Sequence, residues 1–168
     1  MKTISKLLAV TSLLTIVSYT LMAQSNTDFS ITIEGEVLKP MKLSVKDLEK
    51  FPITEVKAQD RDGKEHTFKG TLLSVVLDSA GVTLGKQLKG ENLAKYVLIK
   101  AVDGYEVIFS LPEIDPEFTA QTVLLATSVD GSSLAKGEGP FRIVAPQDKK
   151  HARWIREIVS INVKFSND

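Results

Sequence analysis

The alternation of apolar and polar positions predicts that this chain consists mainly of β-strands. In residues 29–37, Ile31, Ile33 and Val37 share one face and polar side chains occupy the other. This period of two is typical of a strand that buries only one face. The last strand, residues 159–165, alternates more regularly, with Val159, Ile161, Val163 and Phe165 on its apolar face. Further strands are expected at 41–43, 53–59, 65–68, 96–102, 105–110, 122–128 and 141–145.

Three Asp-Gly pairs, at 62–63, 103–104 and 130–131, mark tight turns at the ends of predicted strands, because glycine readily adopts the positive φ that such turns need. The first pair ends the tip, residues 60–63, of an expected hairpin formed by the strands 53–59 and 65–68. We expect a polar loop at 85–91 and an irregular segment at 111–118.

One longer helix is predicted at residues 71–80. Its apolar residues Leu73, Val76, Leu77 and Ala80 recur at the spacing of one helix face, and Gly81 follows where a helix commonly ends. A short helix is expected at 45–50, opened by a capping box of Ser44 and Asp47, and a helical turn at 152–156. The fold class is therefore α+β, mostly β, with one main helix.

The first 23 residues are typical of a secretory signal peptide. Two lysines precede an uncharged apolar run, residues 7–21, and Ala23 stands before a polar segment. An uncleaved anchor is the less favoured alternative, because the run is short for a membrane span. We therefore expect export to the periplasm or the medium, no membrane association after cleavage, and one domain at 24–168.

The charge balance argues against nucleic acid as a partner. Removal of Lys2 and Lys6 leaves 19 basic and 21 acidic residues, a formal charge of −2. Neither zinc nor hydrolase chemistry has a recognisable motif: the chain has two distant histidines, no cysteine, and no G-x-S-x-G sequence. No catalytic or metal-ligating residue is therefore assigned. The Gly137–Gly139 run also lacks the remaining residues of a nucleotide-binding loop.

A basic cluster near the C-terminus is the best candidate for ligand binding. Its members are Arg142, Lys149, Lys150, His151, Arg153 and Arg156. Arginine can hold phosphate or carboxylate through two hydrogen bonds. The alternative is a solvated basic loop, which the sequence alone favours. Trp154 within this cluster could stack on a ligand, although a core tryptophan is the commoner case.

Four segments in order resemble the oxidoreductase molybdopterin-binding domain family, which has the sulfite oxidase fold. They are the helix segment from Phe68 to Val82, the Asp103-Gly104-Tyr105 hairpin, the segment from Leu124 to Leu134, and the Gly139-Pro140-Phe141-Arg142 run with Pro146 and Arg153-Trp154. The resemblance covers roughly residues 29–163. It implies a mostly β domain that cradles a molybdopterin cofactor. Carried onto this chain, it implies cofactor contacts from Arg142, His151 and Arg153, with Asp103 and Tyr105 near the pocket wall.

The chain departs from this family at the metal ligand. The family binds molybdenum through one cysteine placed before the helix, near residues 56–60 here, and this chain has no cysteine. Thiolate is the soft ligand that suits such a centre. The chain is also short, lacking the segments that close over the pterin in the enzymes. Molybdopterin thus remains a candidate cofactor, and molybdenum is disfavoured.

Three functions stay open, in this order of preference. The first is an exported module that binds a pterin-like or other small anion, or an unidentified protein partner. The second is a molybdopterin-dependent oxidoreductase whose metal has a non-cysteine environment. The third is a structural or interaction protein whose pocket has closed.

Overall fold

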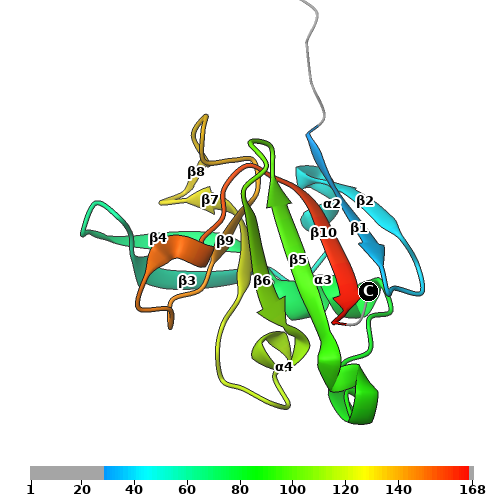
Figure 1. The fold of residues 1–168 in the computed structure, drawn as a ribbon. Coiled ribbons are helices and arrows are strands. Elements are labelled where there is room, and N and C mark those ends of the chain that lie inside the picture. The colour runs from blue at the N-terminus through cyan, green and yellow to red at the C-terminus, as the bar shows by residue number, and fades with distance from the viewer. Residues whose placement is uncertain (1–28, 167–168) are drawn as a thin grey trace, which may run out of the picture.

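Two β-sheets form the body of the protein in the computed structural model, which describes residues 29–166 (Figure 1). The first sheet has the strand order β2-β1-β10-β5-β6. Its strands are β1 (Ser30–Gly35), β2 (Met41–Ser44), β5 (Lys95–Ala101), β6 (Glu106–Ser110) and β10 (Ile158–Phe165). The strand β10 pairs in parallel with β1 and antiparallel with β5, so the last strand of the chain is central in this sheet.

The second sheet has the order β3-β4-β7-β8, with β9 paired to β7 as well. Its strands are β3 (Thr54–Gln59), β4 (Glu65–Leu72), β7 (Leu124–Val129), β8 (Ser132–Ser133) and β9 (Arg142–Val144). The strands β3 and β4 form the predicted hairpin, with Gln59 opposite Glu65 and the tip between them. This hairpin extends from the body of the molecule (Figure 1).

The helical segments are short: α2 (Val45–Leu48), α3 (Leu73–Ser79) and α4 (Leu111–Ile114), with 3-10 turns η2 (Gly85–Gln87), η3 (Gly90–Ala94) and η4 (His151–Arg153). The predicted capping box of α2 is confirmed, since Asp47 Oδ2 accepts the Ser44 backbone N–H at 3.0 Å. The main helix begins later than predicted. Thr71 and Leu72 still belong to β4, because their backbones pair with β7.

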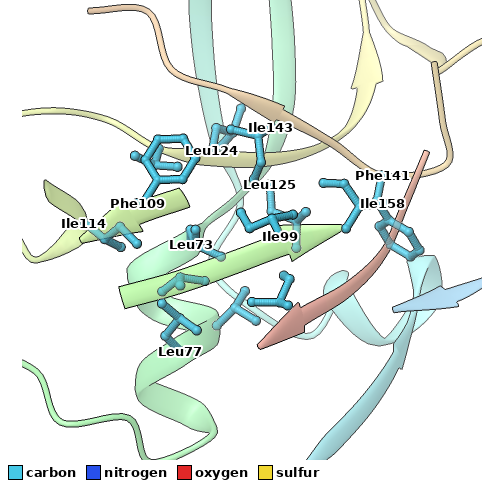
Figure 2. Close-up of a cluster of buried hydrophobic side chains, with 14 of the residues drawn as sticks. Leu73, Leu77, Ile99, Phe109, Ile114, Leu124, Leu125, Phe141, Ile143 and Ile158 are labelled. Atoms are coloured by element: carbon cyan, nitrogen blue, oxygen red, sulfur yellow. The ribbon is translucent and has the colours of Figure 1, made fainter. Parts of the chain in front are cut away.

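Figure 2 shows the core between the two sheets, where α3 places Leu73 and Leu77 against side chains from both. Leu125 of β7 and Ile99 of β5 both belong to this cluster and are fully buried. The predicted apolar face of the last strand is wrong at one position. Val159 is 37% exposed, because the pairing of β10 with β5 shifts register beside it, and Ile158 is buried in its place.

The α+β, mostly β fold class is confirmed. The expected polar loop 85–91 instead contains the turn η2 and the start of η3. The predicted signal peptide lies outside the described residues and stays a prediction. Within residues 29–166, no helix has the length and apolar character needed to cross a membrane.

Candidate functional site

A cleft of about 400 Å³ lies where three separate turns meet. The β3–β4 turn contributes Arg61, the β5–β6 turn contributes Asp103 and Tyr105, and the segment between η4 and β10 contributes Trp154 and Arg156. This volume is in the range of pockets that bind small molecules, roughly 300 to 1,000 Å³. Glu157 also lines the cleft.

Glu157 has a left-handed backbone, with φ at 48°. Its N–H donates to the carbonyl of Glu138 at 3.3 Å, and its carbonyl accepts the N–H of Val102 at 3.0 Å. For a residue with a β-carbon such a conformation costs on the order of 1 kcal/mol, so it persists only where the surroundings enforce it. The neighbouring segments therefore fix the shape of the cleft wall at this point.

The Arg142 side chain lies behind the cleft and is only 1% exposed. Its guanidinium makes two hydrogen bonds to Asp60, of 2.7 and 2.8 Å, and a third to Glu138 at 2.7 Å. It also lies over the rings of Phe68 and Trp154, with centroid distances of 5.1 and 5.5 Å. Arg142 therefore ties the β3–β4 turn to β9, and its charge is already neutralised by the protein.

Asp60 is held ionised by this contact. Partial burial by itself raises the pKa of the carboxyl, but the hydrogen bonds from the Arg142 guanidinium and the Arg61 backbone N–H outweigh it and lower the pKa to about 2. The arrangement is the fork-to-fork pairing in which an arginine–carboxylate contact is strongest.

Three guanidinium groups converge at this end of the molecule. Arg156 donates to Glu138 at 2.6 Å, but its Nε–H is buried and has no hydrogen-bond partner. Burial lowers the pKa of Arg156, and the charges of Arg142 and Arg61 lower it further against the opposing charge of Glu138. Arg61 itself is exposed and donates to the carbonyl of His151 at 3.2 Å. The cleft lining thus carries two guanidinium groups, Arg61 and Arg156, beside two carboxylates, Asp103 and Glu157, so it offers both donors and acceptors.

Tyr105 and Trp154 supply aromatic surface to the cleft. The Trp154 indole is 1% exposed and donates to the carbonyl of Ala145 at 2.9 Å, as expected of a core tryptophan. The Tyr105 hydroxyl donates to the carbonyl of Ala152 at 2.9 Å. Both rings are therefore held in place by hydrogen bonds, but only Tyr105, which is 49% exposed, offers ring surface to a ligand.

His151 and Arg153 occupy positions outside the cleft lining. The His151 ring packs edge-on against Trp154, and its Nε2 lies 2.8 Å from the carbonyl of Gln59. Arg153 pairs with Asp148 at 2.7 Å and Glu113 at 2.9 Å. The hydrogen bonds that Arg153 donates to Asp148 and Glu113 raise its pKa despite its partial burial. Its charge is thus already balanced by two carboxylates.

Of the five residues predicted from the sequence, Asp103 and Tyr105 line the cleft, whereas Arg142, His151 and Arg153 make internal contacts near it. Sequence reasoning did not assign Arg61 to the site. Its position in the Asp60-Arg61-Asp62-Gly63 turn was visible, but nothing in the sequence showed which other turn it would meet. Arg156 belonged to the basic cluster without being singled out.

The comparisons with known proteins agree with this fold. The family model for the oxidoreductase molybdopterin binding domain matches residues 62–167. The chain belongs to this family. A solved structure, the sulfane dehydrogenase SoxCD from Paracoccus pantotrophus, superposes with a TM-score of 0.66 at 21% identity, covering 87% of this chain and 41% of that one. The chain thus spans less than half of that relative. Among curated proteins, no match was found.

The side chains of this family member do not fit a thiolate-bound molybdenum centre. The sequence contains no cysteine. In the segment where the resemblance places that ligand, Ala58 is a small buried residue, and Asp60 is committed to Arg142. Within residues 29–166, no group of three or more His, Asp and Glu side chains is arranged to hold a metal ion. The cleft itself has the size and polar groups for an organic ligand.

Proposed function

We propose that this protein is an exported binding module that takes a small, flat, anionic ligand into the cleft, without metal-centred redox chemistry. The observation that carries the proposal is the pair of guanidinium groups on the cleft lining, of which Arg61 is exposed and Arg156 lies in the opposite segment. A hydrogen bond from an exposed guanidinium to a charged ligand oxygen contributes about 1.5 to 3 kcal/mol.

The other residues of the cleft limit the ligand class. Asp103 and Glu157 are acceptors for N–H groups, and the exposed ring of Tyr105 presents apolar surface. A heterocycle with N–H donors on one edge and a carboxylate or phosphate on another complements both sets of charges. Pterins have this chemistry, so membership of a molybdopterin-binding family supports the same class of ligand.

The test is calorimetric titration with pterin-6-carboxylate, with inorganic phosphate and uncharged pterin as separate probes. Trp154 is the only tryptophan, so its fluorescence gives a second readout from the cleft wall. The Arg61→Gln variant removes an exposed guanidinium from the cleft. Lys57→Gln is the matched control, because it removes an exposed cation from the same hairpin but outside the cleft.

We expect one-to-one binding of pterin-6-carboxylate that Arg61→Gln weakens about tenfold or more, the value of one charge-assisted hydrogen bond, and that Lys57→Gln leaves unchanged. Equal affinities for the two variants, or no saturable binding of any probe, would overturn the proposed ligand site. Stoichiometric molybdenum in protein purified through its native export route would overturn the metal-free part of the proposal.

A further inference from the structure

A single histidine connects the two turns on this side of the second sheet. His66 lies near the start of β4, and each of its ring nitrogens faces a carboxylate from a different turn. Nδ1 lies 2.6 Å from Asp130 in the β7–β8 turn, and Nε2 lies 3.1 Å from Asp62 in the β3–β4 turn. A carboxylate can only accept hydrogen bonds when ionised, so both contacts form together only if the imidazole carries two protons.

The Asp130 side of this contact is rigid. Asp130 Oδ1 accepts the Thr67 backbone N–H at 2.9 Å, and the Asp130 backbone N–H donates to the Thr67 carbonyl at 2.8 Å. Asp130 also has a left-handed backbone, with φ at 49°. These contacts hold its carboxylate in place against Nδ1, so this side of the contact has a fixed position.

The Asp62 side belongs to the exposed turn between β3 and β4. Asp62 Oδ1 accepts the Lys64 backbone N–H at 3.0 Å, and this turn also bears Asp60 and Arg61. Loss of the second proton from His66 would leave Asp62 with one fewer contact to the sheet. The turn would then keep only its contacts on the opposite side, which are the pairing of Asp60 with Arg142 and the hydrogen bond from Arg61 to the His151 carbonyl.

Charged groups from the elements around His66 favour its cationic form. Asp130 and Asp62 raise the pKa of the imidazole through their hydrogen bonds and their charge, against a smaller effect of burial. Lys64 acts on Asp62 and, with His66, holds the pKa of that carboxyl low. On β3 the residue opposite His66 is the uncharged Ala58, and the nearest ring is that of Phe68, at 6.3 Å.

We propose that His66 is a pH-sensitive clamp. In its doubly protonated form it fastens the β3–β4 turn to the β7–β8 turn and so holds Arg61 at the cleft, and deprotonation releases the β3–β4 turn. The clamp stands on the geometry of His66 alone. Its effect on ligand affinity rests on the proposed ligand site.

The sign of the effect follows from the direction of the pKa shift. The pKa of His66 is higher in the folded protein than in the unfolded chain. Its contribution to the stability of the folded state is therefore complete below about pH 6.5 and is lost as pH rises through the pKa of the folded protein. The β3–β4 turn should therefore be better ordered in mildly acidic solution than in alkaline solution.

The test uses the whole mature chain and two measurements. Nuclear magnetic resonance titration gives the pKa of His66, and amide hydrogen exchange, expressed as protection factors, gives the order of residues 60–64. We expect a pKa above 6.5 that falls in Asp130→Asn. We expect protection in the turn to decrease about two- to fivefold between about pH 5 and about pH 8, the size expected for exposed ion pairs.

The His66→Gln variant keeps an amide donor but cannot carry the charge, so its turn should show the same protection at both pH values. A His66 pKa at or below 6.5, or protection in the wild type that is as independent of pH as in His66→Gln, would overturn the clamp.

The ligand measurement separates the two proposals. If pterin-6-carboxylate binds, its affinity should decrease with pH in the wild type more than in His66→Gln. If the ratio of the wild-type affinity to the His66→Gln affinity did not change with pH, the proposed effect of His66 on ligand binding would be overturned. If no probe binds but protection still depends on His66, the ligand site fails and the clamp is supported.

Discussion

The substitution Asp60→Asn tests whether a buried ion pair, rather than a cofactor, fixes the position of Arg142. Asp60 directly follows β3 in the β3–β4 turn, and both its oxygens accept hydrogen bonds from the Arg142 guanidinium. The Arg142 side chain is 1% exposed and that of Asp60 is 15% exposed. The substitution keeps the size of the side chain and removes its charge.

The expected cost is about 2 to 3 kcal/mol in the free energy of unfolding. Removing one partner of a fully buried pair costs about 3 to 5 kcal/mol, because the other charge is left uncompensated. Two features bring the expected cost of Asp60→Asn to the lower limit of this range or below it. Glu138 still holds Arg142 at 2.7 Å, and the amide oxygen of asparagine can accept one of the two lost hydrogen bonds.

The assay is urea denaturation at neutral pH, with Glu65→Gln as the control. Glu65 is an exposed acid of the same hairpin, and its substitution should change stability by less than about 0.5 kcal/mol. A double-mutant cycle with Arg142→Met then isolates the pair. If Asp60→Asn were no more costly than Glu65→Gln, the reasoning about a buried, protein-neutralised Arg142 would be refuted.

Acid adds an independent check on the same pair. The folded pKa of Asp60, about 2, is below its ordinary value of 3.8. Its stabilising contribution is therefore present above the ordinary value and is lost as pH falls through the folded one. Between about pH 4 and pH 2 the wild type should lose more stability than Asp60→Asn does. Parallel pH profiles for the two proteins would contradict the assignment.

Three further predictions concern other parts of the fold. Gly70→Ala should destabilise by about 3 kcal/mol or more in urea denaturation, because its new Cβ would lie 2.1 Å from the Leu125 carbonyl oxygen, whereas Gly63→Ala, in open space with φ at 79°, should cost about 1 kcal/mol. Arg153→Ala should cost about 1 to 2 kcal/mol by the same assay and leave pterin-6-carboxylate affinity unchanged, since its partners lie outside the cleft; a tenfold weaker affinity would instead assign it to the site. Ser44→Ala should cost about 1 kcal/mol through loss of the α2 cap, measured as a lower thermal midpoint, and an unchanged midpoint would show that the cap contributes nothing.

Most of the strands and turns follow from local patterns in the sequence. The alternation in β1 and β10 follows from a sheet that buries one face, and the Asp-Gly pairs occur at turns whose glycines have positive φ. Local capping chemistry identified α2. The exposure of Val159 could not be predicted, because the register shift that causes it depends on pairing with a strand about 60 residues earlier.

Which charged residues line the cleft depends on contacts between distant parts of the chain. The sequence grouped Arg142, His151 and Arg153 as one basic cluster, and folding gave each of them a separate internal contact. Folding also placed Arg61, in the β3–β4 turn, in the same cleft as Arg156, although the two residues are about 95 positions apart in the sequence. The physical reason is that charges are neutralised by whichever opposite charge the fold brings within hydrogen-bond distance, and spacing along a chain does not contain that information.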